Sequence, residues 1–595
     1  MILILGGTTE GRLAVRVCDA AGKPYWYSTR GELQQVECSN GEHITGAMDF
    51  EAMAAFCAGH GIKLIIDVAH PFASELHRTV AAVSESLDLP VVRVERVYAE
   101  RDASVIWCDD YDDAVERLEA DGIGKLLALT GVQTIGRLKP YWERHECYFR
   151  ILHREESLQK ALEQGFDPTH LVYYEEDDEA SLIEQFHPQA ILTKESGESG
   201  GFGAKVDAAR AAGIPVYAVK RPALPAGFET VTGEIGLRKA IERLVPGFFA
   251  LRSGFTTGAC ATAASKAALM ALMGQDVPSD IEITFPDGER LCLPVTDVFS
   301  DGRTGTATVV KDAGDDPDVT NGVGVVATVA FSDTPGIRFL QGEGVGRVTL
   351  PGLGLEIGGP AINRVPREMM TRELSALYGG GLDVTISVPG GRELAQRTFN
   401  PKLGVVDGIS IIGTSGVVRP FSNEAFVEAL RREVEVAVAI GVTHLIINSG
   451  AKSEAFLKRR FPDAPAQAFI HYGNFIGETL KIAAEAGIRK VTMGIMMGKA
   501  VKLADGHLDT HSKNVVMNKA FLKALAAEAG CSPAAQGAID SMTLARELQE
   551  KLDPADLTLF SRALLQRCQR TCESAYPQSA GDLQILLITE SGDIL

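Results

Sequence analysis

The stretch ILILGGTTEGRLAVRVCDAAG, residues 2–22, decides the fold expected for the first part of this chain. Four apolar residues precede a glycine-rich loop, residues 6–11, and apolar residues then recur at helical spacing. A strand, a glycine loop and a helix in this order point backbone N–H groups at an anion such as a phosphate. The nucleoside-triphosphate loop is excluded because Arg12 and Leu13 replace its Lys and Ser/Thr, and the spacing is not G-x-G-x-x-G. The loop predicts a variant dinucleotide site, with a tight turn that binds nothing as the alternative.

The next expected strand, residues 25–27, ends in Ser28, Thr29 and Arg30. A site for a nicotinamide cofactor without the extra phosphate has an Asp or Glu here. Two hydroxyls and a guanidinium suit a 2′-phosphate instead, so the sequence predicts NADPH rather than NADH. The alternative is that Arg30 is a solvated loop cation.

Several further apolar runs end in polar loops. They are KLIIDVAHPFA (63–73), LLALTG (126–131), AILTKESGESGG (190–201) and IPVYAVKRP (214–222). The carboxyl ends of parallel strands share one edge of an open sheet, where such sheets bind ligands. One site is therefore expected to include Asp67, His70, Thr193, Lys194, Ser196 and Arg221. His70 and Lys194 are plausible proton donors, with a turn-capping histidine and a surface lysine as the alternatives.

The composition restricts the class of protein. The 595 residues fit several domains. A net charge of −20 argues against nucleic acid as partner, because binding phosphates requires a basic surface. The ten cysteines form no C-x-x-C pair, so reduced thiols are expected. Apolar runs fall short of a signal peptide or a membrane span. We expect a cytoplasmic protein and leave homo-oligomerisation open.

The segment 246–250 is expected to be a short linker between two enzymes, residues 1–245 and 251–595. Strand and helix patterns alternate before it, and motifs of another kind follow. Phe248 and Phe249 suggest that the segment packs against the protein. The fold class expected is α/β throughout.

Two glycine-rich stretches of the second part are candidate cofactor loops. TTGACATAASKAALMAL (256–272) begins with threonines that can cap a helix. GEGVG (342–346) has the glycine spacing of common methyltransferases, but Pro351 prevents a following helix, so their usual fold is not expected. The candidate residues are Thr257, Gly258, Gly342, Gly344 and Gly346.

The acidic stretch VVKDAGDDPDVTNG (309–322) is less ordinary. Its four aspartates follow Lys311 at spacings that do not match a calcium loop. Four carboxylates need a cation or donors, such as the sulfonium of S-adenosylmethionine; a solvated loop is the alternative. Asp315 and Asp316 are candidate catalytic residues, and Lys311 is a candidate substrate ligand.

Basic and histidine residues complete the candidates. Arg347 and Arg367 lie in Gly- and Pro-rich loops that suit carboxylates, or they serve solubility. A parallel-sheet lobe is expected after residue 423, with Lys499 at a strand end. His511 is a candidate proton-handling group, and His507 lacks the third ligand that a metal site needs, so no protein-bound metal is expected.

In the first part GGTTEGR, DVAHPFA, LTG, TKESGESGG and KRP occur in this order, which resembles the precorrin-6A reductase family of cobalamin biosynthesis. The resemblance implies two Rossmann-like lobes and NADPH as hydride donor to the macrocycle. It implies that Gly6, Gly7, Thr8, Glu10 and Gly11 bind the cofactor and that His70, Thr193, Lys194 and Ser196 line the substrate cleft. Thr9, in the same loop, is a further candidate cofactor-binding residue.

In the second part TTGACA, KDAGDDPD, GEGVGRVT, PAINRVPR, GTSG and VKLADG resemble the cobalt-precorrin-5B methyltransferase family. That family methylates carbon 1 of the macrocycle with S-adenosylmethionine and has a non-standard fold. The expected product of the second part is the expected substrate of the first, so the sequence predicts two successive steps on a cobalt-containing substrate. Two alternatives are an NADPH-sensing first part without catalysis and an NADPH reductase joined to a kinase-like domain.

Overall fold

The computed structural model describes residues 1–595 except 32–35, 97, 99, 175–178 and 512–514. Contacts between residues divide it into two compact units. The first comprises Met1–Leu251 and Glu289–Leu291, and the second comprises Arg252–Gly288 and Cys292–Leu595.

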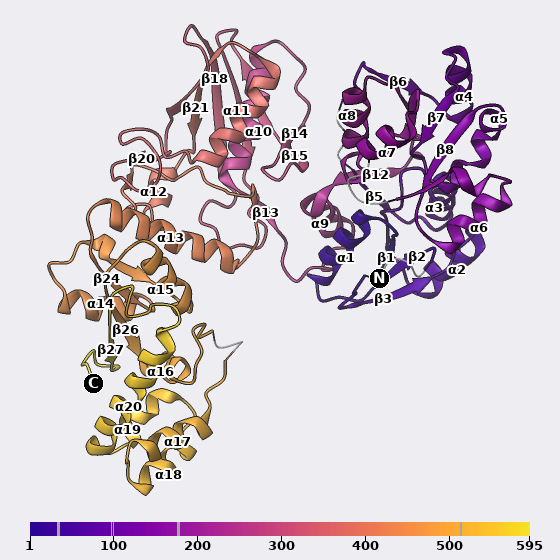
Figure 1. Cartoon of the computed structure of the whole chain (residues 1–595). Coiled ribbons are helices and arrows are strands. Elements are labelled where there is room, and N and C mark those ends of the chain that lie inside the picture. The colour runs from indigo at the N-terminus through magenta and orange to yellow at the C-terminus, as the bar shows by residue number, and fades with distance from the viewer. Residues whose placement is uncertain (32–35, 97, 99, 175–178, 512–514) are drawn as a thin grey trace. The chain divides into compact units, whose positions relative to one another are not determined.

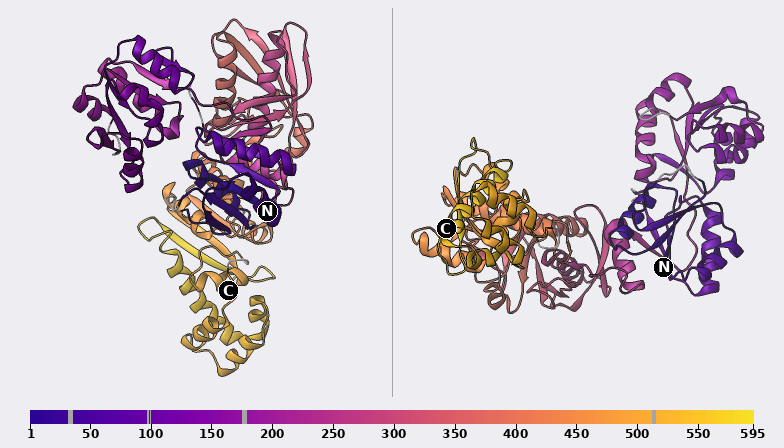
Figure 2. Two further views of the ribbon diagram at one scale, coloured as in Figure 1. Left: turned by 90° about the vertical axis from the view of Figure 1, so that its right-hand side faces the viewer. Right: turned by 90° about the horizontal axis from the view of Figure 1, so that it is seen from below.

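The first unit contains two parallel sheets that form separate lobes (Figures 1 and 2). The strand order of the first sheet is β12(Phe228–Thr232), β5(Val91–Glu95), β4(Leu64–Asp67), β1(Ile2–Leu5), β2(Tyr25–Thr29) and β3(Gly41–Thr45). Its helices are α1(Thr9–Asp19), α2(Phe50–Gly59), α3(Ser74–Leu87) and α9(Gly233–Leu244). This is the strand order of a doubly wound dinucleotide-binding sheet. Its sixth strand, β12, follows the whole second lobe in the sequence.

The second lobe is continuous in sequence. Its strand order is β6(Val105–Cys108), β11(Val216–Val219), β10(Ala190–Lys194), β7(Lys125–Ala128), β8(Glu146–Ile151) and β9(Leu171–Tyr173). Its helices are α4(Tyr111–Ala120), α5(Lys139–Trp142), α6(Glu155–Glu163), α7(Glu179–Phe186) and α8(Phe202–Ala212). All of its neighbouring strands run parallel.

Apolar burial explains both sheets. The four residues of β1 are at most 3% exposed, because helices cover a parallel sheet on both faces. The first sheet accordingly has two separate apolar cores, one on each side. Phe248 and Phe249 join one of these cores, as the sequence predicted, with their rings edge to face at 5.5 Å.

The second unit begins with a mixed sheet. Its order is β16(Thr296–Ser300), β17(Thr304–Val310), β18(Gly324–Ser332), β21(Gly381–Ser387) and β19(Ile337–Gln341). Helix α10(Thr257–Leu272) packs on it, and helix α11(Arg364–Leu377) packs on α10. Shorter elements surround it: β13(Gly254–Phe255) with β23(Val417–Val418), β14(Asp280–Thr284) with β15(Arg290–Pro294), β20(Arg347–Val348) with β22(Val405–Val406), and α12(Gly391–Ala395).

A parallel-sheet lobe follows, as the sequence predicted. The strand order is β25(Phe469–His471), β24(His444–Asn448), β26(Lys490–Met496) and β27(Asp582–Ile588). The helices are α13(Asn423–Ala439), α14(Ala451–Arg460), α15(Ile476–Glu485), α16(Met497–Ala504), α17(Lys519–Glu528), α18(Pro533–Ser541), α19(Leu548–Lys551) and α20(Pro554–Cys572). The fold class is therefore α/β, as expected. The last 70 or so residues complete the lobe, because β27 pairs with β26 along seven positions.

A partly buried ion pair connects the lobe to the loop between α12 and β22. Lys402 Nζ donates to the carboxylate of Glu433 in α13 and to the carbonyl of Phe469. The Glu433 side chain is 4% exposed.

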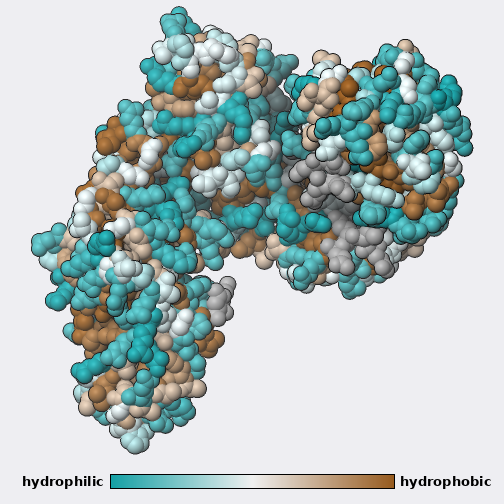
Figure 3. Space-filling model, in the orientation of Figure 1, coloured by the Kyte–Doolittle hydropathy of each residue, from teal (hydrophilic) through white to brown (hydrophobic). Residues whose placement is uncertain are grey.

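The face drawn in Figure 3 is largely hydrophilic, with hydrophobic residues in scattered patches. Within the described ranges, no helix has the length and apolar content needed to cross a membrane.

Candidate active sites

The glycine loop of the first unit connects β1 to α1 and contacts Tyr27. A Cβ at Gly6 would lie 2.3 Å from atoms of the Tyr27 ring, and one at Gly11 would lie 2.5 Å from its hydroxyl. Gly7 has φ of +111° with open space beside it, and its N–H donates to the Tyr27 hydroxyl at 3.3 Å. Side chains are excluded at these positions, so the backbone at the start of α1 can approach a ligand closely.

Thr8 and Glu10 complete this loop. The Thr8 hydroxyl donates to the carbonyl of Val68 at 2.6 Å, which fixes the loop against β4. Thr9 is the first residue of α1. The Glu10 carboxylate accepts from Ser199 Oγ at 2.7 Å and faces Arg96 Nε at 3.1 Å.

The three polar residues predicted at the end of β2 differ in exposure. Ser28 and Thr29 are 6% and 4% exposed, and the Thr29 hydroxyl is bound to Gly31 O at 2.9 Å and His43 Nε2 at 2.7 Å. Arg30 is exposed. Of the three residues predicted to bind a 2′-phosphate, Arg30 alone is accessible from solvent.

Asp67 lies inside the protein. Its side chain is fully buried, and it accepts from Arg93 Nη1 at 3.0 Å and from the backbone N–H of Ala69 at 3.0 Å, while His77 Nδ1 lies 2.7 Å away. Burial would raise its pKa, but His77 and Arg93 outweigh that effect and hold the pKa below its ordinary value. These partners keep Asp67 from a ligand, so its predicted substrate contact is replaced by a role in ordering the turn before His70.

His70 and Lys194 are brought together at the junction of the lobes. Burial and the nearby charge of Lys194 lower the pKa of His70 to about 3. Burial and Arg96 lower the pKa of Lys194 to about 8. His70 Nδ1 accepts from the Phe72 N–H at 3.2 Å, and Lys194 Nζ lies 5.5 Å from the Phe72 ring centroid. The His70 imidazole is therefore neutral at pH 7, and the pKa of the nearby Lys194 is close to neutral pH.

The remaining predicted residues of this site differ in access. Thr193 is fully buried, and its hydroxyl has no partner within the described part of the chain. Ser196 donates to Gly200 O at 3.1 Å. Arg221 lies 3.7 Å above the Tyr98 ring and pairs with Glu195 at 3.3 Å. Ser196 and Arg221 are thus tied to the backbone of Gly200 and to Glu195, and Thr193 is closed off from solvent.

The sequence reasoning missed two buried cations in the second lobe. Arg150 at the end of β8 pairs with Glu179 at 3.0 Å. Lys205 in α8 is 8% exposed and donates to Gly200 O at 2.8 Å, and burial, with Arg150, lowers its pKa to about 8. Arg150 follows a run of strand residues, so its position at a strand end was the one available signal.

The glycines predicted to bind a cofactor in the second unit pack against other segments. A Cβ at Gly258 would meet Pro366, one at Gly342 would meet Ser387, and one at Gly344 would lie 2.0 Å from the carbonyl of Val388. Thr256 caps α10, as predicted, by accepting from Ala259 N at 3.2 Å.

Neighbouring cofactor candidates are similarly engaged in packing. Thr257 is 4% exposed, and its hydroxyl accepts from Ile412 N at 2.9 Å. A Cβ at Gly346 would meet Val405 and Gly408. Close packing of the backbone therefore accounts for these residue types, and cofactor binding at the five positions remains a prediction.

The acidic stretch obtains its counter-charges from the protein. Lys311 is 2% exposed and donates to Asp318 and to Thr320 Oγ1 at 2.7 Å. Its burial and these partners argue against the substrate contact that the sequence predicted for it. Asp315 accepts from the backbone N–H of Arg252 at 2.6 Å. Burial, followed by the charge of Asp318, raises the pKa of Asp316. Asp316 also accepts from Phe421 N at 3.2 Å.

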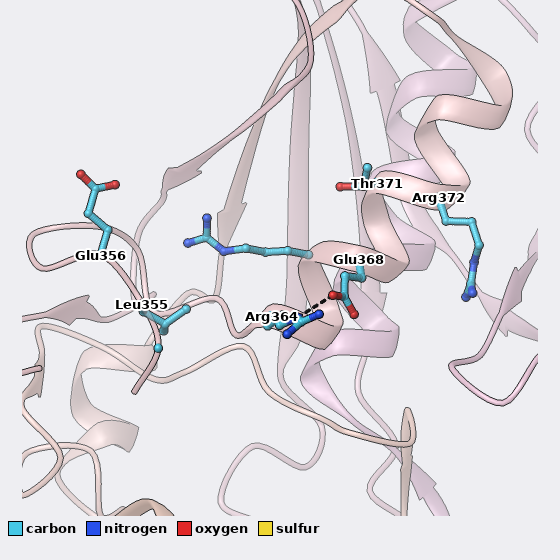
Figure 4. A pocket seen from close by; sticks show the side chains of 8 residues that line it. Leu355, Glu356, Arg364, Glu368, Thr371 and Arg372 are labelled. Atoms are coloured by element: carbon cyan, nitrogen blue, oxygen red, sulfur yellow. Dashed lines mark hydrogen bonds and ion pairs between the residues drawn. The ribbon is translucent and has the colours of Figure 1, made fainter. Parts of the chain in front are cut away.

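An open groove of 490 Å³ lies beside α11 (Figure 4). Its lining is Gly354, Leu355, Glu356, Arg364, Arg367, Glu368, Thr371 and Arg372. Arg367 is held by the carbonyls of Ile362 at 2.7 Å and Pro360 at 3.2 Å. Arg347 pairs with Asp407 at 3.3 Å, and its backbone bridges to Pro360. Arg347 is not a lining residue; the guanidinium groups of the groove are those of Arg364, Arg367 and Arg372, a residue type suited to carboxylates.

Lys499 and the segment that carries His511 are both hydrogen-bonded to Asn474, which follows β25. Lys499 Nζ donates to Gly473 O and to Asn474 Oδ1 at 2.9 Å, and burial, with Lys502, lowers the pKa of Lys499 to about 8. The backbone N–H of His511 donates to Asp509 Oδ1 at 3.0 Å, and Thr510 N donates to Asn474 O at 3.0 Å. At the neighbouring strand end, Gly450 has open space beside it.

Comparisons with known families agree with the two units. Residues 1–237 match the family described as Precorrin-6x reductase CbiJ/CobK, residues 247–420 match CbiD, and residues 509–595 match the CbiD C-terminal domain.

Relatives in sequence cover the second part. The cobalt-precorrin-5B C(1)-methyltransferase of Prosthecochloris aestuarii is 45% identical over 355 residues, which are 58% of this chain and 96% of the relative. That of Geobacillus thermodenitrificans is 43% identical over 340 residues, 56% of this chain and 91% of the relative.

Two solved structures are similar at low overall scores. The CobK precorrin-6A reductase has a TM-score of 0.35 and 22% identity, covering 41% of this chain and 97% of its own. The cobalamin biosynthesis protein cbiD from Archaeoglobus fulgidus has a TM-score of 0.24 and 27% identity, covering 44% of this chain and 83% of its own.

The chain is a bifunctional enzyme, an oxidoreductase followed by a methyltransferase. It belongs to the cobalt-precorrin-5B C(1)-methyltransferase family, to which a domain of the precorrin-6x reductase family is fused at its N-terminal side. Both domains have roles in cobalamin biosynthesis. Reductases and methyltransferases of these types use NADPH and S-adenosylmethionine.

Proposed function

We propose that the chain methylates cobalt-precorrin-5B at carbon 1 with S-adenosylmethionine and then reduces the resulting cobalt-precorrin-6A to cobalt-precorrin-6B with NADPH. The single observation that carries this proposal is the presence, in one chain, of two families whose names refer to successive macrocycles. The cobalt is part of the substrate. On this proposal the protein acts in the cytoplasm, and its partners are small corrin precursors.

Residues of the first unit fit NADPH. The glycine loop brings the start of α1 against open space at Gly7, and a carboxylate already accepts hydrogen bonds there. Arg30 would bind the 2′-phosphate at the end of β2. Bound NADPH would supply the hydride for the macrocycle, while the protein orients both partners and supplies the proton.

Lys194 is the better candidate for the proton donor. An acid works best when its pKa is close to the working pH. The pKa of Lys194 is about 8, whereas that of His70 is about 3, so His70 is neutral at pH 7. We propose that Lys194 protonates the reduced double bond and that His70 orients the substrate by a hydrogen bond. Thr193, Ser196 and Arg221 would contact the macrocycle or its carboxylates from the second lobe.

For the second unit we propose that S-adenosylmethionine binds at the carboxyl edge of β24, β25 and β26. Ligands of open parallel sheets bind at this edge. Gly450 follows β24 and has no atom within 4 Å of an added Cβ, Lys499 follows β26, and His511 lies next to Thr510, which is bonded to Asn474 after β25. Methyl transfer needs the two reactants held close and dry, so no protein nucleophile is required.

The macrocycle carries several carboxylates, and the groove beside α11 suits them. Arg367 in the groove and Arg347 outside it are the guanidinium groups we assign to substrate binding, with Asp315 and Asp316 at the acidic turn as candidate catalytic groups. The raised pKa of Asp316 would assist proton removal from the methylated macrocycle.

The decisive experiment supplies cobalt-precorrin-5B, S-adenosylmethionine and NADPH to the whole chain and follows the mass of the macrocycle. The expected product gains one methyl group and two hydrogens. Methylation without reduction would contradict the reductase assignment and favour an NADPH sensor, which the reductase match at residues 1–237 does not support. Binding of labelled ATP but not S-adenosylmethionine would favour the kinase-like alternative.

A further inference from the structure

We infer that the Glu10 carboxylate occupies the place of the cofactor's pyrophosphate, and that NADPH binds by displacing it and taking over Arg96 and Ser199. This inference rests on the proposed use of NADPH by the first unit. It assigns two new cofactor-binding residues and gives Glu10 the role of an exchangeable stand-in.

The first observation is that several donors converge on one carboxylate. Ser199 Oγ donates to Glu10 Oε1 at 2.7 Å, and Arg96 lies 3.1 Å from Oε1 through Nε and donates to Oε2 at 3.2 Å through Nη2. The backbone N–H of Glu10 itself also contributes. The Arg96 and Glu10 side chains are only 6% and 12% exposed. These are the kinds of donors that recognise phosphate oxygens.

The second observation is the electrostatic balance at this place. Burial alone would raise the pKa of Glu10, but the bonds from Ser199, its own backbone and Arg96 outweigh burial and lower the pKa. The carboxylate is therefore ionised at neutral pH. An anion at the N-terminus of α1 is what the preceding glycine loop predicts for a dinucleotide, and here a side chain provides it.

The third observation is that the donors belong to separate parts of the unit. Glu10 lies in α1 of the first lobe, and Arg96 directly follows β5, where the chain leaves that lobe. Ser199 lies after β10 of the second lobe. Arg96 Nη1 also donates to Ser196 O at 2.7 Å. A Cβ at Gly200 would lie 3.2 Å from Arg96 Nη1, so glycine there leaves room for the guanidinium.

Two anions will not share this place, because like charges at contact distance repel strongly. A pyrophosphate that reaches the start of α1 must displace Glu10, and it then meets Arg96 and Ser199 already positioned. The affinity for the cofactor thus depends on how much more strongly the pyrophosphate binds these donors than the Glu10 carboxylate does. The pyrophosphate is bound by residues of both lobes, whereas the 2′-phosphate is bound separately by Arg30.

The test measures dissociation constants of the full-length chain for NADPH, NADH, ADP-ribose and adenosine 2′-monophosphate. Glu10→Gln should bind the three pyrophosphate ligands about tenfold tighter, the value of one charge-assisted hydrogen bond. Arg96→Ala should bind them about tenfold more weakly. Adenosine 2′-monophosphate, which lacks a pyrophosphate, should be unaffected by either change. The matched control Arg30→Ala should weaken NADPH and adenosine 2′-monophosphate but leave NADH unchanged.

Unchanged or weaker binding of ADP-ribose by Glu10→Gln would overturn the exchange. Should that variant fail to fold, judged by its urea midpoint, Arg96→Ala decides: unchanged ADP-ribose affinity would overturn the inference. A wild-type chain that binds none of NADPH, NADH and ADP-ribose would instead contradict the proposed cofactor. Binding of NADPH with no effect of Glu10→Gln refutes the exchange alone.

Discussion

Replacing Lys194 by methionine should stabilise the first unit while removing its proposed proton donor. The pKa of Lys194 falls from 10.5 to about 8 because its ammonium is buried. Each pKa unit corresponds to about 1.4 kcal/mol, so the charged lysine opposes folding by about 3 kcal/mol at neutral pH. Methionine retains apolar contact with Phe72 and carries no charge. The free energy of unfolding should rise by up to about 3 kcal/mol at pH 7.

The sign of the pH dependence follows from the same two pKa values. Below pH 8 the lysine is charged in both states and the full penalty applies. Between pH 8 and about 10.5 the unfolded state binds more protons, so wild-type stability rises with pH. The advantage of Lys194→Met should therefore shrink above pH 8 and vanish near pH 10.5.

The assay can be confined to the first unit. The chain has three tryptophans, Trp26, Trp107 and Trp142, and all lie there. Urea unfolding followed by tryptophan fluorescence at pH 7 and pH 10 gives the two free energies. The matched control is Lys205→Met, whose gain should be smaller because the Lys205 ammonium donates to Gly200 O at 2.8 Å. Equal or lower stability of Lys194→Met at pH 7, or the same gain at pH 10, would refute the reasoning.

Further predictions concern activity and packing. Reduction of cobalt-precorrin-6A should slow as the pH rises through about 8, because Lys194 then loses its donated proton; a kcat/KM profile flat through pH 8 would contradict this. Gly6→Ala should cost about 1–3 kcal/mol through its contact with Tyr27, against about 1 kcal/mol for Gly7→Ala, where only the backbone is strained; urea midpoints compare them. Glu433→Gln should cost about 3 kcal/mol because it removes the carboxylate that neutralises Lys402, and urea unfolding of the whole chain followed by circular dichroism measures the loss.

The sequence predicted the fold best where local pattern and tertiary structure coincide. Apolar runs such as β1 are buried on both faces, and their length and bounding glycines distinguish them as parallel strands. Polar residues at strand ends were also found in this way, as with Lys194 and Lys499. Their positions follow from topology, which the order of elements largely determines.

What the pattern could not show is whether a polar side chain already has a partner. Asp67 and Lys311 lie among motif residues, yet both are buried against their own ion-pair partners. Arg96 escaped notice for the opposite reason. It follows a strand without any motif, and its relation to Glu10 is created only when two lobes meet. Glycines 342 and 344 illustrate a third limit, because close backbone packing and ligand approach demand the same residue.

The late return of β12 has a consequence for synthesis of the chain. β12 pairs with β5 in parallel, but the entire second lobe is translated between them. While a ribosome is adding the second lobe, β5 is an open edge that could pair wrongly with other strands. The second lobe, being continuous, can fold first. The nascent first lobe is completed only when residues 228–244 emerge, so nucleotide binding should begin only after the second lobe has been synthesised.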